Sequence, residues 1–338
     1  MVWHAGLLVK LQELGMPITI LKLIASWLQN REAYIAFGKK KSDRYHIKIG
    51  LPQGSSLSPF LFIVYHCDLI RCLGAHLGHL FADDLCVLIR APITKALPPA
   101  IKFLEEEDTK ISNAIAEYAR KWKQPINVQK TVGQIFYTQI QRPNVNVYME
   151  GVRLDIVNSF KYLGFTWTNK MSLKPTVDQC LGKVESALAK LKWMKKGQKI
   201  STQVLRQCFF AYVFPHFAWI FPLYPFLPKT QQEALNRKFR VALRIVQRFP
   251  YVSARDIYTI TRENPLEIYV KRYIKKRLET SHRSDLGRSL FVNDIFFWDY
   301  FKKNKYDSMG HFFRQSRVKK LIKRHETLII TWIGFIEN

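Results

Sequence analysis

The chain is strongly basic and rich in apolar residues. Its 338 residues include 53 Lys and Arg against 26 Asp and Glu, which gives a formal net charge of +27, and 48% of them are hydrophobic. Such a chain can bury a core and favours a polyanionic partner, nucleic acid before membrane, so a neutral or acidic small-substrate enzyme is a poor fit.

Hydrophobic periodicity predicts mixed structure in the first half of the chain and helices in the second. Two helices come first, followed by a hairpin, a helix, a second hairpin, a long helix and a strand. We expect these elements at residues 7–14, 20–28, 30–50, from 58 onward, 79–89, 101–122 and 145–149. After residue 177 the apolar stripes all have helical spacing. The fold class is therefore α+β, with a switch to helical structure near residues 168–176.

Most of the excess charge lies in the second half. Residues 1–170 hold 21 basic and 13 acidic residues, whereas residues 171–338 hold 32 and 13. The second half is therefore the better candidate for gripping phosphates. Five cysteines form no C-x-x-C pair, so neither a zinc knuckle nor a disulfide framework is supported, and a reducing intracellular setting is expected.

One segment has the composition of a membrane span. Residues 208–227 contain no Lys, Arg, Asp or Glu, which meets the length needed to cross a bilayer. Pro215, Pro222 and Pro225 would each delete a helical hydrogen bond, and His216 is polar at the centre. We expect a buried, broken helix here, and no secretory signal at the amino terminus.

Asp83 and Asp84 stand side by side at the tip of the predicted second hairpin. Their mutual repulsion and partial burial oppose ionisation, so a cation should offset them. Mg²⁺ is the natural candidate because it prefers carboxylate oxygen and bridges substrate phosphates. Taken alone, however, such a pair favours a solvated turn.

A turn-rich segment precedes this pair by about 30 residues. Residues 50–59 have the sequence G-L-P-Q-G-S-S-L-S-P. Pro52 fixes one turn, Gly54 permits close backbone approach, and small hydroxyl side chains lead into a helix. Such an element can lie against a flat or charged ligand. Alone, this segment could be only a loop and a helix cap. Followed by a carboxylate pair of the metal-binding type, it indicates a functional site.

Four ordered segments resemble motifs of reverse transcriptases, in the spelling of non-LTR retrotransposons. Residues 50–59 resemble G-x-P-Q-G-S-x-L-S-P, and residues 81–84 (F-A-D-D) resemble the [YF]-x-D-D palm hairpin. Residues 126–131 (I-N-V-Q-K-T) resemble L-N-x-x-K-T, and residues 160–164 (F-K-Y-L-G) resemble the K-Y-L-G primer grip. Residues 2–8 also resemble the end of the first palm motif, D-x-x-x-A-F-D-x-V-W-H-x-x-L.

This resemblance implies a right-hand polymerase fold. An antiparallel palm sheet with helices would be followed by a basic helical thumb, with the fingers largely missing. The expected domains are a reverse-transcriptase palm at residues 1–170, a helical thumb or connection at 171–280, and a basic helical extension at 281–338.

The resemblance also implies roles for individual residues. Asp83 would be the principal metal ligand and Asp84 a weaker one, while Lys130 would place positive charge near the leaving phosphates. The expected substrate contacts are Pro52, Gln53, Gly54 and Ser55 on the template and nucleotide floor, and Tyr162, Leu163 and Gly164 at the primer end. Arg237, Arg240, Arg244 and Arg248, opposite an apolar stripe, would track a phosphate backbone. Each of these residues also has a purely structural interpretation when the motifs are set aside. Lys130 would then be a surface lysine, Tyr162 would be an ordinary aromatic residue of a strand, and the arginines would form a solvated basic face.

The first palm motif would supply another metal-binding aspartate, and residue 1 stands just after its place. The expected two-metal Mg²⁺ site is therefore incomplete, and polymerisation by this chain alone should be weak or absent, unless Asp68 acts as the opposing ligand. The expected partners are an RNA template, a DNA primer and deoxynucleotides, with no membrane; protein partners stay open, and the nucleus is favoured over the cytoplasm. The alternatives are a non-catalytic nucleic-acid-binding remnant and, disfavoured by its prolines, a helical membrane protein.

Overall fold

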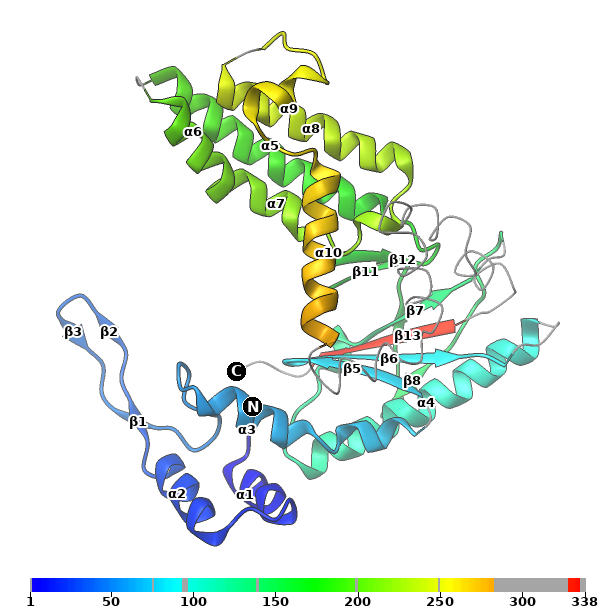
Figure 1. Ribbon diagram of the computed structural model, residues 1–338. Coiled ribbons are helices and arrows are strands. Elements are labelled where there is room, and N and C mark those ends of the chain that lie inside the picture. The colour runs from blue at the N-terminus through cyan, green and yellow to red at the C-terminus, as the bar shows by residue number, and fades with distance from the viewer. Residues whose placement is uncertain are drawn as a thin grey trace. The chain divides into compact units, whose positions relative to one another are not determined.

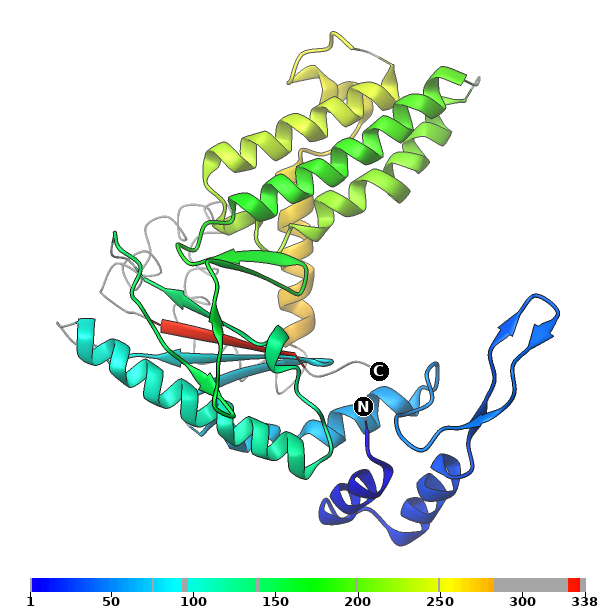
Figure 2. The ribbon, with the colours of Figure 1, turned by 180° about the vertical axis from the view of Figure 1, so that it is seen from behind.

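The computed structural model describes residues 2–74, 76–92, 97–137, 140–197, 200–248, 250–282 and 328–334. The chain forms two compact units, one of residues 1–160 with 325–338 and one of residues 161–324. Helices and strands mix in the first unit and helices dominate the second, as the hydrophobic periodicity predicts (Figures 1 and 2). The α+β fold class is thus confirmed.

The first unit is built around a five-stranded sheet with the order β10-β7-β13-β6-β5. Its strands are β5 (Leu77–Phe81), β6 (Asp84–Arg90), β7 (Val132–Phe136), β10 (Asp155–Ile156) and β13 (Leu328–Gly334). β10 runs parallel to β7, whereas the remaining neighbours are antiparallel, so the sheet is mixed rather than purely antiparallel as expected. The helix α4 (Leu97–Lys121) lies along one face of this sheet (Figure 1).

The amino-terminal elements agree with the periodicity of the sequence. The helices α1 (His4–Glu13), α2 (Ile18–Leu28) and α3 (Leu57–His66) flank a hairpin arm of four short strands, with bounds β1 (Glu32–Ala33), β2 (Ala36–Phe37), β3 (Lys40–Lys41) and β4 (Tyr45–His46). The 3-10 helix η1 (Leu69–Leu73) follows α3, η2 (Val128–Lys130) precedes β7, and the hairpin β8 (Tyr148–Met149) and β9 (Val152–Arg153) packs against α4. The predicted hairpins and helices of this part are confirmed.

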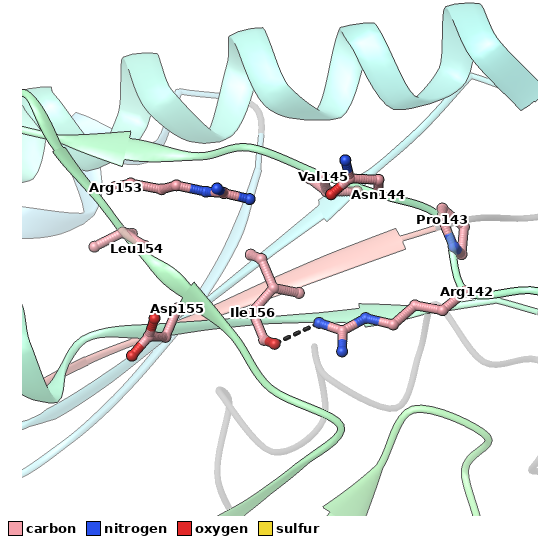
Figure 3. A pocket seen from close by; sticks show the side chains of 8 residues that line it. All are labelled: Arg142, Pro143, Asn144, Val145, Arg153, Leu154, Asp155 and Ile156. Carbon is pink, nitrogen blue, oxygen red and sulfur yellow. Dashed lines mark hydrogen bonds between the residues drawn. The ribbon is translucent and has the colours of Figure 1, made fainter.

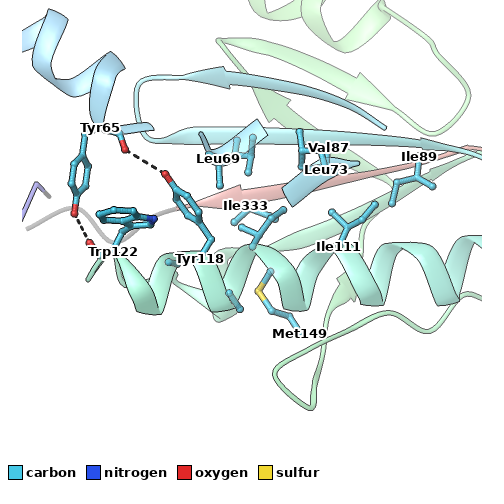
Figure 4. Close-up of a cluster of buried hydrophobic side chains, with 14 of the residues drawn as sticks. Tyr65, Leu69, Leu73, Val87, Ile89, Ile111, Tyr118, Trp122, Met149 and Ile333 are labelled. Carbon is cyan, nitrogen blue, oxygen red and sulfur yellow. Dashed lines mark hydrogen bonds between the residues drawn. The ribbon is translucent and has the colours of Figure 1, made fainter. Parts of the chain in front are cut away.

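Buried side chains fill the space between the sheet and α4. Val87 and Ile89 of β6, Ile111 of α4 and Ile333 of β13 meet in this core (Figure 4). A polar group lies within the same cluster: Lys10, with 2% of its side chain exposed, donates hydrogen bonds to Asp68 Oδ1 at 2.5 Å and to the Tyr118 hydroxyl at 2.6 Å. Its ammonium group also lies 3.9 Å from the centre of the Trp122 ring. These contacts tie α1 to α4 and to the end of α3.

The second unit is a helical bundle. Its helices are α5 (Lys174–Gly197), α6 (Thr202–Cys208), the π-helical turn η3 (Phe209–Val213), α7 (Phe214–Trp219), η4 (Tyr224–Phe226), α8 (Lys229–Gln247), α9 (Asp256–Thr261) and α10 (Leu266–His282). Phe209, Phe217 and Phe239 are fully buried at its centre, with the last two rings 5.5 Å apart and almost perpendicular. The chain enters this unit through the strands β11 (Ser159–Tyr162) and β12 (Phe165–Thr168), which pair with each other.

The uncharged segment at residues 208–227 is a broken, buried helix, as predicted. It passes through α6, η3, α7 and η4, and Phe209, Val213 and Phe217 point into the bundle core. Within the described residues, no helix has both the length and the apolar character required to cross a membrane.

The carboxyl-terminal part differs from the prediction. Most of the basic helical extension expected at residues 281–338 lies outside the described residues. Residues 328–334 form a strand, β13, so the expectation of helix is wrong for them. The segment L-I-I-T-W-I-G is rich in β-branched residues, which suit a strand paired on both edges.

Candidate functional site

The two neighbouring aspartates lie at the tip of the hairpin of β5 and β6, as predicted. Phe81 pairs with Asp84, so Ala82 and Asp83 form a two-residue connection in which Ala82 has a φ of +52°. Asp83 is half-buried and Asp84 is exposed. Partial burial, and then the negative charge of Asp83, raise the pKa of the Asp84 carboxyl above its usual value. The pair therefore favours a nearby cation.

The sheet register brings Lys130 to the same end of the sheet as the carboxylates. β13 pairs Gly334 with Asp84, and it pairs Trp332 both with Cys86 of β6 and with Val132 of β7. Lys130 is the last residue of the 3-10 helix η2 and stands two residues before β7 begins, so it lies near the end of the sheet at which Asp84 is paired. Two strand spacings separate the backbones of β6 and β7 by roughly 10 Å. The Lys130 side chain is exposed, which leaves it accessible to an anion.

The described residues do not supply a complete metal site. They contain no group of three or more His, Cys, Asp or Glu side chains placed to hold one ion. Asp68, the alternative opposing ligand, is engaged elsewhere, because its Oδ1 accepts hydrogen bonds from Lys10 and from Tyr118 at 2.7 Å. Burial raises the pKa of Asp68, but the hydrogen bonds from Lys10 and Tyr118 together with the charge of Lys10 leave the pKa below its usual value. The carboxylates of the described residues are therefore too few to hold two metal ions.

The turn-rich segment forms an ordered loop before α3. Gly50 and Gly54 have φ angles of +82° and +87°, and the Ser58 hydroxyl donates a hydrogen bond to the Pro52 carbonyl at 2.6 Å. His4 Nε2 lies 2.7 Å from the Gly50 carbonyl oxygen, which ties the loop to α1. Gln53 and Gly54 are exposed, and no atom lies within 4 Å of where a Cβ on Gly54 would stand. The backbone of this loop is thus open to a ligand.

The predicted primer-grip residues form a tight turn between β11 and β12. Leu163 and Gly164 have φ angles of +49° and +86°, so both central residues of this two-residue hairpin are left-handed. Tyr162 is buried, whereas Leu163 is 37% exposed. Trp219 of α7 lies beneath the turn, because its ring stacks on Phe165 at 4.4 Å and its Cζ2 would be 3.2 Å from a Cβ on Gly164. Sequence reasoning missed Trp219, which carries no motif signal.

The three arginines of α8 and Arg248, which follows its last residue, have unequal surroundings. Arg237 is exposed. Arg240 forms an ion pair with Glu233 at 2.5 Å, and Arg244 donates to the Val252 carbonyl at 2.9 Å. Arg248, at the end of the helix, donates to the Ile200 carbonyl. Three of the four arginines thus donate hydrogen bonds to partners within their own unit. The role of the four in binding a phosphate backbone stays a prediction.

Two hollows in the first unit are lined mostly by residues outside the motifs, with Ala82 of the F-A-D-D segment among those that line the second. One of about 560 Å³ is lined by Arg142, Arg153 and Asp155 among others, and Arg142 donates to the Ile156 carbonyl across it (Figure 3). The other, of about 300 Å³, lies between α3 and the β5–β6 hairpin and is lined mainly by apolar side chains. His66 borders it, and burial lowers the pKa of His66 to about 4, so this histidine is neutral at physiological pH.

Comparison with known proteins agrees with the motifs. Residues 1–167 match the family described as reverse transcriptase (RNA-dependent DNA polymerase). The chain is 27% identical over 197 residues to the probable RNA-directed DNA polymerase from transposon X-element of Drosophila melanogaster. This alignment covers 57% of the chain and 21% of that protein.

Two further relatives extend the similarity into the second unit. Over 303 residues, or 86% of the chain, it is 24% identical to the probable RNA-directed DNA polymerase from transposon BS of Drosophila melanogaster and 25% identical to the RNA-directed DNA polymerase from mobile element jockey of Drosophila funebris. These alignments span about a third of each relative, 32% in both cases.

Proposed function

Residues 1–167 belong to the reverse transcriptase family and are homologous to the RNA-directed DNA polymerases of non-LTR retrotransposons; from this premise we propose that the chain is the palm and thumb part of such a polymerase. The observation that supports the proposal is the sheet end at which the hairpin tip carries Asp83 and Asp84 and at which η2, with Lys130, precedes β7. Two carboxylates and a cationic side chain at one end of a sheet suit the phosphates of an incoming nucleotide.

The remaining motif residues fit contacts with nucleic acid. The open backbone around Gly54 can lie against a flat base or sugar, and the turn at Leu163 presents an exposed apolar side chain to a primer end. An RNA template, a DNA primer and deoxynucleotides are the proposed partners, with the exposed Arg237 among the contacts to phosphate. A nuclear location follows from these partners as part of the proposal.

Members of this family generally use divalent metal ions, and we propose Mg²⁺ for this chain. Asp83 and Asp84 supply two carboxylates from one hairpin, which can hold an ion only weakly. Phosphoryl transfer requires ligands on opposing segments to fix the ions relative to the primer hydroxyl. Loss of several kcal/mol of transition-state stabilisation lowers the rate by several powers of ten, since about 1.4 kcal/mol is a tenfold change. The described donors alone should therefore not support polymerisation.

Primer extension tests this proposal. Residues 1–338 with Mg²⁺, a primed RNA template and deoxynucleotides should show no extension above background. The same chain preceded by an upstream segment with the sequence D-x-x-x-A-F-D should extend the primer. In that longer protein Asp83→Asn should abolish extension, whereas Asp43→Asn, the same change at an exposed residue of the hairpin arm, should not.

Either of two results would contradict the proposal. Robust, Asp83-dependent extension by residues 1–338 would show that the site is complete. Extension by the longer protein that survives Asp83→Asn would remove the catalytic assignment.

A second candidate is a non-catalytic nucleic-acid-binding remnant. The incomplete donor set in the described residues favours it. This candidate predicts salt-dependent binding of nucleic acid without nucleotide addition, even when the upstream segment is present.

A further inference from the structure

A backbone carbonyl group at the entry to the turn-rich loop is held from two other parts of the first unit. The Gly50 carbonyl oxygen lies 2.7 Å from His4 Nε2 of α1 and accepts a hydrogen bond at 3.2 Å from Nη1 of Arg31, a residue between α2 and β1. The Gly50 N–H donates to the Val2 carbonyl at 2.8 Å. We infer that His4 and Arg31 are positioning residues, which orient the loop at residues 50–59 for its substrate through this one carbonyl group.

The contact at His4 has a definite direction. A carbonyl oxygen can only accept a hydrogen bond, so the Nε2 atom of His4 must carry a hydrogen and donate it to Gly50. The ring is half-buried, and this contact holds it against the start of the loop. The position of Nε2 therefore requires a hydrogen-bond donor, which a side-chain amide also supplies and an aliphatic side chain does not.

The backbone of Gly50 sets the direction in which the loop begins. Its φ angle of +82° lies in the left-handed region, where glycine is free to vary its conformation. The N–H bond to Val2 fixes the peptide group before the Gly50 Cα, and the donors from His4 and Arg31 fix the peptide group after it. With both peptide groups held, the chain leaves Gly50 in one direction.

The loop is held a second time on its other side. The Pro52 carbonyl accepts hydrogen bonds from the Ser58 hydroxyl of α3 at 2.6 Å and from the Ser55 N–H at 3.4 Å. Gln53 and Gly54, which lie between Pro52 and Ser55, stay exposed. Contacts with α1 and Arg31 before this exposed pair, and with α3 after it, therefore determine where the pair lies.

His4 and Arg31 act through Gly50 and not on the substrate itself. The loop atoms that are open to a ligand belong to Gln53 and Gly54, three and four residues further along the chain. Two donors share one acceptor, so the removal of one donor leaves the carbonyl held by the other, and the removal of both should have the larger effect. The effect on a substrate rests on the proposed function, whereas the hydrogen bonds to Gly50 do not.

NMR of residues 1–338 provides the first test, and it needs no polymerase activity. His4→Leu should shift the ¹³C resonance of the Gly50 carbonyl and increase the backbone mobility of Gln53 and Gly54 in ¹⁵N relaxation. His4→Gln keeps a donor and should restore both values, whereas a packing role would make the two variants equal because their side chains have similar volumes. An unchanged Gly50 resonance in His4→Leu, or equal changes in both variants, would overturn the inference.

Primer extension by the longer protein, with the upstream segment D-x-x-x-A-F-D, provides the second test. His4→Leu combined with Arg31→Met should raise the KM for the deoxynucleotide at least tenfold and change kcat less than threefold, because the loop holds the substrate equally before and during the reaction. His4→Gln combined with Arg31→Lys should restore most of the KM. Arg44→Met removes the same charge from an arginine of the hairpin arm that is 74% exposed, and it should leave the KM unchanged.

The two tests separate this inference from the proposed function. If the longer protein does not extend a primer, the proposed function fails, and the Gly50 resonance with the mobility of Gln53 and Gly54 still decides whether His4 positions the loop. If the longer protein extends a primer and the double variant keeps its KM, the proposed function stands and the positioning role of His4 and Arg31 is overturned.

Discussion

The turn at Leu163 and Gly164 is governed by backbone conformation at single residues. Both residues have positive φ, which a side chain makes unfavourable, and Gly164 also lies against Trp219. Gly164→Ala should lower the free energy of unfolding by about 1–3 kcal/mol, because it adds strain and overlap at a fixed ring.

A matched glycine gives the opposite sign. Gly182 lies inside α5 with no atom within 4 Å of the position of a Cβ, so Gly182→Ala should raise the free energy of unfolding by about 1 kcal/mol. Chemical denaturation of both variants checks the pair. Equal effects would show that neither the left-handed turn nor Trp219 constrains residue 164.

The carboxylate pair offers a second residue-scale prediction. The charge of Asp83 contributes to the raised pKa of Asp84, after burial. Asp83→Asn should therefore lower the pKa of Asp84 toward its usual value, leave folding intact or slightly improved, and abolish binding of a divalent cation. An NMR pH titration, with Mn²⁺ broadening as the metal readout, measures both effects. Loss of the fold with cation binding retained would contradict the assignment.

Asp108 links a single ionisation to the stability of the first unit. Burial raises the pKa of Asp108 to about 6, although hydrogen bonds from Thr331 and Ser112 favour the charged form. In the unfolded chain, the Asp108 carboxyl has the usual aspartate pKa of about 3.9. Between these two values the folded state holds more protons than the unfolded state, so stability should fall as pH rises from about 4 to 6 and stay low above that range.

Asp108→Asn should remove this pH dependence. At pH 7 the variant should be more stable by on the order of 2–3 kcal/mol, since a neutral side chain replaces a buried charge. The nearby His76 is unchanged in the variant, and Glu106→Gln, an exposed change on the same helix, is the control. Denaturant unfolding between pH 4 and 8 measures the difference, and parallel pH profiles for the wild type and Asp108→Asn would contradict the prediction.

At the scale of elements, the sequence predicts what depends on local pattern. The hairpin at residues 79–89 and the stripes of α5 and α8 follow from spacing of two or of three to four residues, and the structure confirms them. The β-branched composition of β13 is a local signal for a strand, but its pairing could not be predicted from the sequence. Its partners β6 and β7 lie almost 200 residues or more earlier in the chain, and spacing within a segment says nothing about partners so distant.

Polar partners inside elements were equally out of reach. Lys10 lies in an otherwise apolar stretch of α1. Only the fold shows that its buried ammonium group forms an ion pair with Asp68 and a hydrogen bond with Tyr118. The arginines of α8 share one face by spacing, but their partners Glu233, Val252 and Ile200 come from different segments. The motif residues could be proposed as a site because short runs of sequence carry their chemistry. Trp219 packs against one of those runs from another helix and carries no such signal.

At the scale of the whole molecule, the charge excess governs how nucleic acid should bind. Lysines neutralise phosphates and release counterions, so the affinity for single-stranded nucleic acid should fall steeply with salt, with a slope of about 0.7 per phosphate contact on logarithmic axes. Three exposed lysines of α5, Lys190, Lys192 and Lys196, lie in the more basic half. Their joint replacement by Gln should reduce the slope by about 2 if each contacts a phosphate.

The hairpin arm supplies a charge-matched control for this last prediction. Lys39, Lys40 and Lys41 are also exposed but belong to the less basic half of the chain. Replacing them by Gln removes the same net charge, so a general field effect would change both triple variants equally, whereas a phosphate track on α5 would change only the first. Fluorescence anisotropy with a labelled oligonucleotide between 50 and roughly 300 mM salt separates the two cases. Equal slopes for both variants would show that the α5 lysines do not bind the phosphate backbone specifically. A binding constant independent of salt would show that the basic half does not bind nucleic acid through its charge.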